Sequence, residues 1–295
     1  MTAVPSDQRA PFPVNPFDDA TGEELAALPL TFREGLFTGK VAVISGAGRG
    51  IGRALAFQFV RLGARVALLG RNEARLNATA EELKKIGGEV FAASGSIRDP
   101  AFVEQFMSEA WAHFGGFDIL VNNAGGQYPQ AAIDFSAKGW NAVIDTNLTG
   151  TWHMTQAAAR LWRDAERHGS IVSIVAVVSR GMPGVAHSCA ARAGVVALSR
   201  TLAIEWAPLN IRVNCVAPGI VATTGMTAYS EAARAELPKT NLMKRFGSVT
   251  DIADAVCYLS GPSGTFITGE VLTVDGGYQL WGDQWTIERP DYFAR

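Results

Sequence analysis

Cysteine is scarce in this chain, and its scarcity excludes two kinds of site. The 295 residues include three cysteines, Cys189, Cys215 and Cys257, and none of them stands at the spacing of a metal-ligand pair. An odd number of cysteines makes no complete disulfide set, which is typical of proteins in a reducing compartment. We therefore expect neither a metal site nor a disulfide framework.

Long apolar runs and an excess of one charge are missing as well. No stretch approaches the roughly 18 apolar residues of a transmembrane helix. The N-terminus has no basic segment followed by an apolar run, so we expect no signal peptide. A formal net charge of −2 attracts neither nucleic acid nor an anionic membrane surface. These absences predict a cytoplasmic enzyme that acts on a small molecule.

The chain divides into an arm, a body and a tail. Residues 1–39 are rich in proline and acidic residues and predict an N-terminal arm with a short helix near 21–28, anchored by Phe32, Leu36 and Phe37. Residues 40–280 form the predicted body. The aromatic and charged residues 281–295 form the predicted C-terminal tail.

Within the body, short apolar β-branched runs alternate with segments of helical period. Strands are predicted at 41–44, 66–69, 90–92, 119–121, 171–175, 213–216 and 271–274, and helices near 51–62, 73–86, 100–114, 137–166, 188–206 and 249–260. Apolar strands between helices are buried on both faces, which indicates a parallel sheet with right-handed crossovers. Residues 220–245 interrupt the alternation and suit a lid over a ligand.

A glycine-rich loop, residues 45–52, joins the first strand to the first helix of the body. Its glycines permit a tight turn and let backbone N–H groups approach a pyrophosphate at the helix N-terminus. NAD-selective sites place a carboxylate about 20 residues further on, and this chain has Arg71 at the end of the second strand, with Arg49 inside the loop. Two guanidinium groups suit a 2′-phosphate, so NADP(H) is expected unless both arginines are merely solvated.

Several further motifs follow in a fixed order. Residues 122–125 read Asn-Asn-Ala-Gly, Asn147 lies in Asp-Thr-Asn-Leu-Thr-Gly, residues 218–223 begin Pro-Gly, and Ile-Thr-Gly at 267–269 precedes Val-Asp-Gly-Gly at 274–277. With the glycine loop, these motifs make residues 40–278 resemble the short-chain dehydrogenase/reductase family. The resemblance implies an α/β fold, a single domain with a Rossmann-like, doubly wound, seven-stranded parallel sheet. It implies cofactor-binding roles for Gly46, Gly48, Arg49, Gly50, Ile51, Gly52, Arg71, Asn72, Ile97, Asn123, Ala124, Gly125, Arg192, Pro218, Gly219, Val221 and Thr223.

The usual catalytic residues of that family are largely replaced. The tyrosine position holds Ser188, the lysine position holds Arg192, and the serine falls on Val175 or Ala176, so only Asn147 is retained. A ketone reductase must protonate the carbonyl oxygen, and an alkyl hydroxyl is a far weaker acid than a phenol. Arginine does not deprotonate near neutral pH, so it supplies only charge and hydrogen bonds there. Simple exchange between carbonyl and alcohol is therefore disfavoured.

Reduction of a conjugated double bond makes a different demand. Hydride goes to Cβ of an unsaturated thioester, and negative charge develops on the thioester oxygen, where fixed donors stabilise it. Ser188 and Arg192 share one helix face and, with Asn147, form such a predicted catalytic donor set. Residues 123–127, 137–140, 187–195 and 266–269 also resemble the peroxisomal trans-2-enoyl-CoA reductases and the related 2,4-dienoyl-CoA reductases. That resemblance implies an NADPH-dependent reductase with an acyl-CoA substrate.

Two other functions are compatible with the same sequence. One is a dehydrogenase of a hydroxy or keto substrate, either a CoA thioester or a cyclic ketone, with its proton acceptor elsewhere. The other is a catalytically silent NADP-binding protein. Relatives in the family imply a homo-oligomer, a tetramer or a dimer, built through helices near 101–114 and 148–166.

Four further side chains near the site are candidates for a role, and three of them have two interpretations each. His187 is either an acid or a cap of the helix start. Tyr128 is either a proton donor or a packing residue, and Tyr229 lies in the expected lid, over an acyl chain or as a simple contact. Cys189 is expected to be a small buried apolar residue, since nothing around it suggests an activated thiol.

Overall fold

A seven-stranded, fully parallel sheet forms the centre of the molecule. The computed structural model describes residues 19–280, so the predicted tail and residues 1–18 of the predicted arm lie outside the described residues. The strand order is β3-β2-β1-β4-β5-β6-β7, which confirms the predicted doubly wound sheet. The strands are β1 (Val41–Ser45), β2 (Arg65–Gly70), β3 (Val90–Ser94), β4 (Ile119–Asn122), β5 (Gly169–Ile174), β6 (Ile211–Pro218) and β7 (Val271–Val274).

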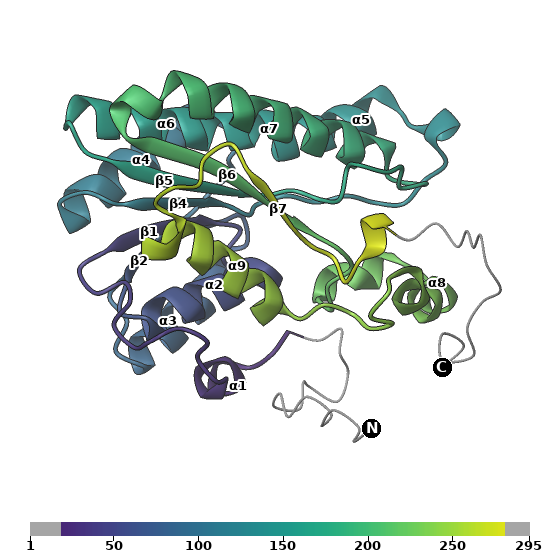
Figure 1. Cartoon of the computed structure of the whole chain (residues 1–295), viewed down its shortest axis with the longest axis horizontal. Coiled ribbons are helices and arrows are strands. Elements are labelled where there is room, and N and C mark those ends of the chain that lie inside the picture. The colour runs from purple at the N-terminus through teal and green to yellow at the C-terminus, as the bar shows by residue number, and fades with distance from the viewer. Residues whose placement is uncertain (1–18, 281–295) are drawn as a thin grey trace.

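Helices cover the sheet in two layers (Figure 1). One layer holds α2 (Gly50–Arg61), α3 (Glu73–Lys85) and α9 (Val249–Ser260); the other holds α4 (Pro100–Phe114), α6 (Gly150–Asp164) and α7 (Ala186–Glu205). Successive residues of a strand face opposite sides. Accordingly, Ala42 and Ile44 of β1 pack into the first layer, while Val41 and Val43 pack into the second. The continuous apolar runs therefore reflect burial on both faces. None of the described helices is long and apolar enough to cross a membrane.

The single helix expected over residues 137–166 is divided in the structure, and that prediction was wrong. It consists of α5 (Ala137–Ile144), a π-helical turn η2 (Asp145–Thr149) and α6. The π turn contains Asn147, whose side chain makes two hydrogen bonds to the backbone of Gly126 on a different loop. Turns of this kind are frequently found at functional sites.

The expected lid is ordered into short helices. Residues 220–245 contain the 3₁₀ turn η4 (Thr224–Ala228), helix α8 (Glu231–Glu236) and the 3₁₀ turn η5 (Leu237–Thr240). A parallel bridge between Val221 and Gly247 joins the two ends of the segment. Hydrogen bonds of 2.9 Å from Ala222 N to Gly247 O and 2.8 Å from Gly247 N to Ile220 O secure it. The lid therefore leaves the body and returns to it at one point.

The described part of the arm lies against α2. Its helix α1 (Gly22–Ala27) starts with a capping box between Thr21 and Glu24. Arg53 of α2 donates to the carbonyl of Ala20, and Arg61 of α2 donates to the carbonyl of Leu25 at 3.1 Å. The predicted anchors Phe32, Leu36 and Phe37 pack on the core, with Phe37 fully buried.

Candidate active site

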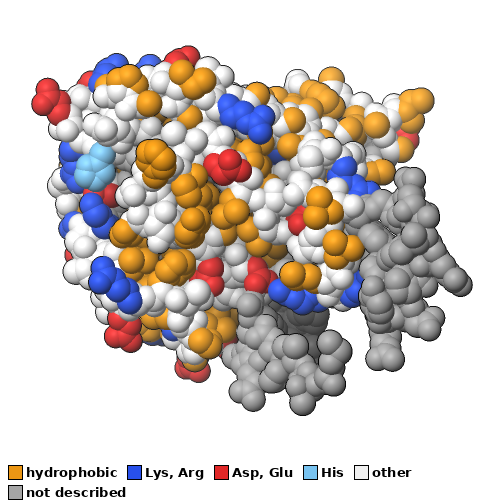
Figure 2. All heavy atoms as spheres, viewed as in Figure 1, with side chains coloured by type: hydrophobic (Ala, Val, Ile, Leu, Met, Phe, Trp, Pro, Cys, Tyr) orange, Lys and Arg blue, Asp and Glu red, His pale blue; other side chains and the backbone are white. Residues whose placement is uncertain are grey.

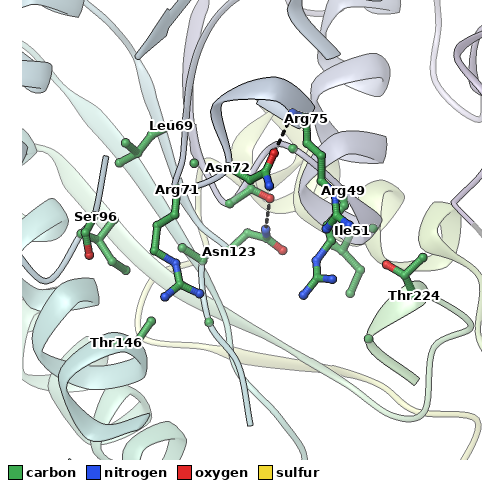
Figure 3. Close-up of a pocket in the computed structure, with 18 of the residues that line it drawn as sticks. Arg49, Ile51, Leu69, Arg71, Asn72, Arg75, Ser96, Asn123, Thr146 and Thr224 are labelled. Carbon is green, nitrogen blue, oxygen red and sulfur yellow. Dashed lines mark hydrogen bonds between the residues drawn. The ribbon is translucent and has the colours of Figure 1, made fainter. Parts of the chain in front are cut away.

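A cleft opens at the carboxyl ends of the strands, between β1 and β4, where the strand order reverses direction. Ligands of open α/β sheets bind at this switch point. The cleft has a volume of about 360 Å³ (Figure 3). Twelve of the predicted cofactor residues line it: Gly46, Gly48, Arg49, Gly50, Ile51, Arg71, Asn72, Ile97, Asn123, Ala124, Gly125 and Thr223.

The glycine loop is held rigidly beside the loop after β4. Gly46 has φ +70°, and a Cβ there would lie 2.9 Å from Ala124 Cα. Asn123 Nδ2 donates to the carbonyls of Ser45 and Gly46 at 3.0 and 3.2 Å. Gly52 lies beneath the loop, where a Cβ would stand 2.3 Å from Gly46 O. Backbone this tightly fixed suits the close approach of a pyrophosphate.

Arginine side chains, and no carboxylates, line the cleft. Figure 3 shows Arg71 entering from one side of the cleft and Arg49 from the other. Arg75 also lines it, and the sequence motifs did not single this residue out. The sequence did contain a signal for Arg75, because it follows Arg71 by about one helical turn and can therefore reach the same cleft. Among the described residues that line the cleft there is no Asp or Glu, so the donors present fit the extra phosphate of a phosphorylated dinucleotide.

Asn147 is buried, and both the oxygen and the nitrogen of its side-chain amide are hydrogen-bonded. Its Oδ1 accepts from Gly126 N at 2.9 Å, and its Nδ2 donates to Gly126 O at 2.9 Å and to Ser188 Oγ at 3.5 Å. The exposed fractions of Asn147 and Ser188 are 0% and 1%. These two predicted catalytic residues are thus brought together, and their contacts hold the loop after β4 in place.

Arg192 is the predicted catalytic residue that reaches an open cavity. Its Nη1 donates to Ile174 O at 2.6 Å. Its Nη2 lies so close to Gly125 that a Cβ there would be 2.1 Å away. Burial lowers the pKa of Arg192 to about 10, so the guanidinium remains a cation near neutral pH. A fixed charge in a site shielded from water acts strongly on any charge that develops beside it.

That second cavity, of about 660 Å³, continues the cofactor cleft. The two share Arg49, Ile51, Asn123, Gly125, Thr223, Thr224 and Gly225 as lining residues. Val175 and Ala176, at the predicted serine position, line the cavity without a hydroxyl, as do the predicted cofactor residues Pro218, Gly219 and Val221. The lid contributes apolar side chains such as Met226 and Leu237. The cavity therefore suits an apolar substrate next to the fixed cation of Arg192.

The structure gives positions to the four further side chains that the sequence singled out near the site. His187 is fully buried, with ring centroids 4.7 Å from Tyr128 and 4.3 Å from Phe135, and its Nδ1 accepts from Ser188 N. The rings of His187 and Tyr128 thus pack against each other, and neither residue is among those that line the cavity. Cys189 is half-buried rather than buried, so that detail was wrong. Tyr229 lines the cavity, and its hydroxyl oxygen accepts from Gln127 Nε2 at 2.7 Å.

Neither a metal nor a disulfide is supported in the described part of the chain. No group of three or more metal-ligating side chains occurs among residues 19–280. The three cysteines are free thiols there. Burial raises the pKa of Cys215 to about 11, so this thiol stays protonated and unreactive near neutral pH.

Comparisons with known proteins agree with this geometry. The family model described as Enoyl-(Acyl carrier protein) reductase matches residues 46–279. A probable 2,4-dienoyl-CoA reductase of Bacillus subtilis (strain 168) is 36% identical over 246 residues, 82% of this chain and 97% of the relative. The 3-oxoacyl-(acyl-carrier-protein) reductase of Escherichia coli (strain K12) is 37% identical over 245 residues, 83% of this chain and 99% of the relative. A carveol dehydrogenase structure from Mycobacterium avium, in complex with NAD, has a TM-score of 0.79 at 29% identity, covering 83% of this chain and 99% of that one.

Proposed function

The chain belongs to the short-chain dehydrogenase/reductase family of oxidoreductases, and from that premise we propose that it is an NADPH-dependent reductase of a conjugated C=C bond in an enoyl thioester. The observation that carries the proposal is the composition of the cavity at the nicotinamide end of the cleft. It holds the buried cation of Arg192 and lacks a hydroxyl at positions 175 and 176. The hydroxyl at position 188 is buried behind it.

The cofactor assignment rests on the arginines of the cleft. The family uses a nicotinamide cofactor. Arg71 and Arg49 hold the 2′-phosphate of NADP(H), and Arg75 adds to the positive field. The glycine loop binds the pyrophosphate through backbone N–H groups at the start of α2. A cofactor held by these residues would supply the hydride for the reduction.

Arg192 acts on the oxygen of the substrate. As the β-carbon of the enoyl group is reduced, negative charge moves to the thioester oxygen. Arg192 Nη2 lies beside Gly125, at the boundary of the two cavities, and stabilises that charge. Asn147 and Ser188 serve as positioning residues, because their hydrogen bonds fix Gly126 and hence the loop against which Arg192 rests. The apolar lining holds the acyl chain and excludes water.

A substrate panel tests the proposal directly. Purified protein is mixed with NADPH and a medium-chain trans-2-enoyl-CoA, a 2,4-dienoyl-CoA, a 3-oxoacyl-CoA or a cyclic ketone, and loss of reduced cofactor is followed. Turnover of the conjugated thioesters alone is expected. Turnover of the carbonyl substrates alone would overturn the proposal. Tight NADPH binding without any turnover would identify a catalytically silent protein.

A second candidate function is reduction of a carbonyl group, or oxidation of the corresponding alcohol. Two observations favour it: a relative at 37% identity is named as a 3-oxoacyl reductase, and two tyrosines, Tyr229 and Tyr278, line the cavity. The double variant Ser188→Tyr with Arg192→Lys distinguishes the two functions. If the pair sets the reaction type, the variant gains ketone reduction and loses enoyl reduction.

We also propose that the protein is a cytoplasmic homo-oligomer. Large hydrophobic side chains are exposed near the sheet edge formed by β7: Ile204 at the end of α7 is 79% exposed, and Phe266, just before β7, is fully exposed. Hydrophobic side chains gather on the face where β7 and α9 lie (Figure 2). Exposed apolar patches of this kind often mark contacts between proteins. A second copy of the chain would bury them.

A further inference from the structure

The reduction proposed above needs a proton at Cα, and the family's usual donor position cannot supply it. Ser188 is buried, and its hydroxyl faces Asn147. Arg192 is a cation whose pKa of about 10 keeps it protonated near neutral pH, and it is placed to stabilise the thioester oxygen. The donor must therefore be another group that lines the same cavity.

The cavity offers few acids. Among its described lining residues there is no Asp, Glu, His, Cys or Lys. The remaining proton-bearing side chains, apart from arginines and amides, are three threonines and two tyrosines: Thr223, Thr224, Thr227, Tyr229 and Tyr278. A phenol, with an ordinary pKa near 10, is a far stronger acid than a threonine hydroxyl. Two of the threonines also already donate within the protein, Thr224 to Asp19 and Thr227 to the Thr224 carbonyl.

Of the two phenols, Tyr229 is the one that is tied to the reaction centre. Gln127 Nε2 donates to its oxygen at 2.7 Å, so the hydroxyl hydrogen is directed elsewhere. Gln127 lies two residues beyond Gly125, which contacts Arg192. The backbone of Tyr229 is also fixed, because its carbonyl accepts from Arg234 Nη1 at 2.9 Å and its N–H donates to Met226 O at 3.0 Å. By contrast, the ring of Tyr278 lies 4.7 Å from the guanidinium of Arg180, which rests over it.

We propose that Tyr229 is the catalytic proton donor, and this assignment rests on the proposed function. In the step, the Oη–H bond of Tyr229 breaks and a C–H bond forms at Cα of the enolate. The electron pair of the enolate becomes that bond, and the thioester carbonyl is restored. With the hydride already at Cβ, the substrate has gained two electrons and NADPH is left oxidised. Water returns a proton to the tyrosinate, whose oxygen the amide of Gln127 stabilises in the meantime. Gln127 is a positioning residue.

The test follows where solvent deuterium enters the product. A trans-2-enoyl-CoA is reduced with unlabelled NADPH in D₂O, and the configuration at Cα is determined by NMR. A donor fixed on one side of the substrate delivers a single configuration. Tyr229→Phe is expected to lower kcat by about 100-fold or more and to give a mixture of configurations, because water then protonates Cα. Its affinities for NADPH and for a saturated acyl-CoA, measured by fluorescence titration, are expected to stay within about twofold if only proton delivery is lost.

Three further variants complete the experiment. Tyr258→Phe changes an exposed tyrosine on α9, outside the site, and is expected to behave like the unsubstituted protein. Tyr278→Phe removes the other phenol of the cavity and is expected to keep a single configuration. Gln127→Met removes the amide and is expected to give a product in which part of the molecules have the opposite configuration at Cα.

Three results would overturn the assignment, and they can be told apart. If the unsubstituted protein reduces no conjugated thioester, the proposed function fails and the donor role fails with it. If the unsubstituted protein does reduce the thioester but Tyr229→Phe retains both rate and single configuration, only the donor role fails. Loss of configuration in Tyr278→Phe instead of Tyr229→Phe would transfer the role to Tyr278.

Discussion

At the scale of single residues, Arg192 is a buried cation that forms no ion pair with a carboxylate of residues 19–280; its guanidinium donates to the carbonyl of Ile174. A buried charge without an opposite charge costs stability. We infer that the fold tolerates this cost because the cation is used in the cavity. Burial is also what lowers the pKa of Arg192 to about 10 from 12.5.

That lowered pKa predicts the alkaline limit of activity. The folded protein carries the cation below about pH 10 and loses it above, so kcat/KM is expected to fall as the pH rises through 10. In Arg192→Lys, the ordinary pKa of the side chain is near 10.4, about two units below that of arginine. The same burial lowers the pKa of that lysine further. Its alkaline limb should therefore move to lower pH. The measurement is kcat/KM against pH for the unsubstituted protein, for Arg192→Lys and for Arg33→Lys as an exposed control. If the alkaline limbs of all three profiles coincide, Arg192 does not act as the cation of the active site.

Arg71 is expected to determine which of the two nicotinamide cofactors the protein binds more tightly. Arg71→Asp replaces a phosphate-binding cation by a carboxylate suited to ribose hydroxyls. A charge-assisted hydrogen bond is worth about 1.5–3 kcal/mol, which corresponds to about a 10- to 150-fold loss in NADPH affinity. NADH affinity is expected to rise. Fluorescence titration of both cofactors checks this, with Arg33→Asp as the charge-matched control. An unchanged ratio would mean that Arg71 is merely solvated.

Residue-level prediction from the sequence was accurate where a motif fixes the backbone. The glycine loop follows β1 and the Asn-Asn-Ala-Gly segment follows β4, as the motifs placed them, and the structure brings the two together at the switch point. The sequence placed Ser188 and Arg192 on one helix face, which the helical period dictates. It did not show that Ser188 faces Asn147 while Arg192 reaches the cavity. That difference depends on the loop after β4, which is distant in sequence.

At the scale of elements, the strands were predicted well because burial on both faces leaves an apolar run that is hard to mistake. The division of residues 137–166 was not predicted, because the apolar pattern continues across the break. The π turn inserts its extra residue where Asn147 must reach Gly126. Only the tertiary structure contains that requirement.

The arm predicts an electrostatic effect on cofactor binding. Asp19 Oδ1 accepts from Gly50 N at 3.0 Å, at the first residue of α2, and from Thr224 of the lid at 3.3 Å. A carboxylate there offsets the positive end of the helix dipole that a pyrophosphate uses. Asp19→Asn keeps an acceptor oxygen but removes the charge, so NADPH affinity is expected to rise by about two- to fivefold, corresponding to roughly 0.3–1 kcal/mol.

Salt provides the internal check of this effect. Because the cause is electrostatic, the gain should shrink as ionic strength increases. Glu23→Gln makes the same charge change at an exposed position of α1 and should leave NADPH affinity unaltered at low and high salt. Weaker binding in Asp19→Asn would show that the arm carboxylate supports the cofactor site instead of opposing the cofactor.

At the scale of the whole molecule, the sheet edge at β7 predicts association. The unsubstituted protein is expected to elute as a dimer or tetramer in size-exclusion chromatography with light scattering. Phe266→Glu places a charge in the apolar contact and should shift the population towards monomer. Ile133→Glu, at a position 94% exposed outside this edge, should not. A monomeric unsubstituted protein, or equal behaviour of the two variants, would contradict the prediction.

The parallel bridge between Val221 and Gly247 makes the lid an exchangeable module. Since both ends of the segment are joined at one point, its length can change without displacing β6 or α9, and the entropic cost of a longer loop grows slowly. Evolution or a protein engineer could thus replace residues 230–246 to accept a longer, shorter or branched acyl group while keeping Tyr229. The cofactor cleft would remain as it is, because Thr223, Thr224 and Gly225 of its wall precede the replaced residues.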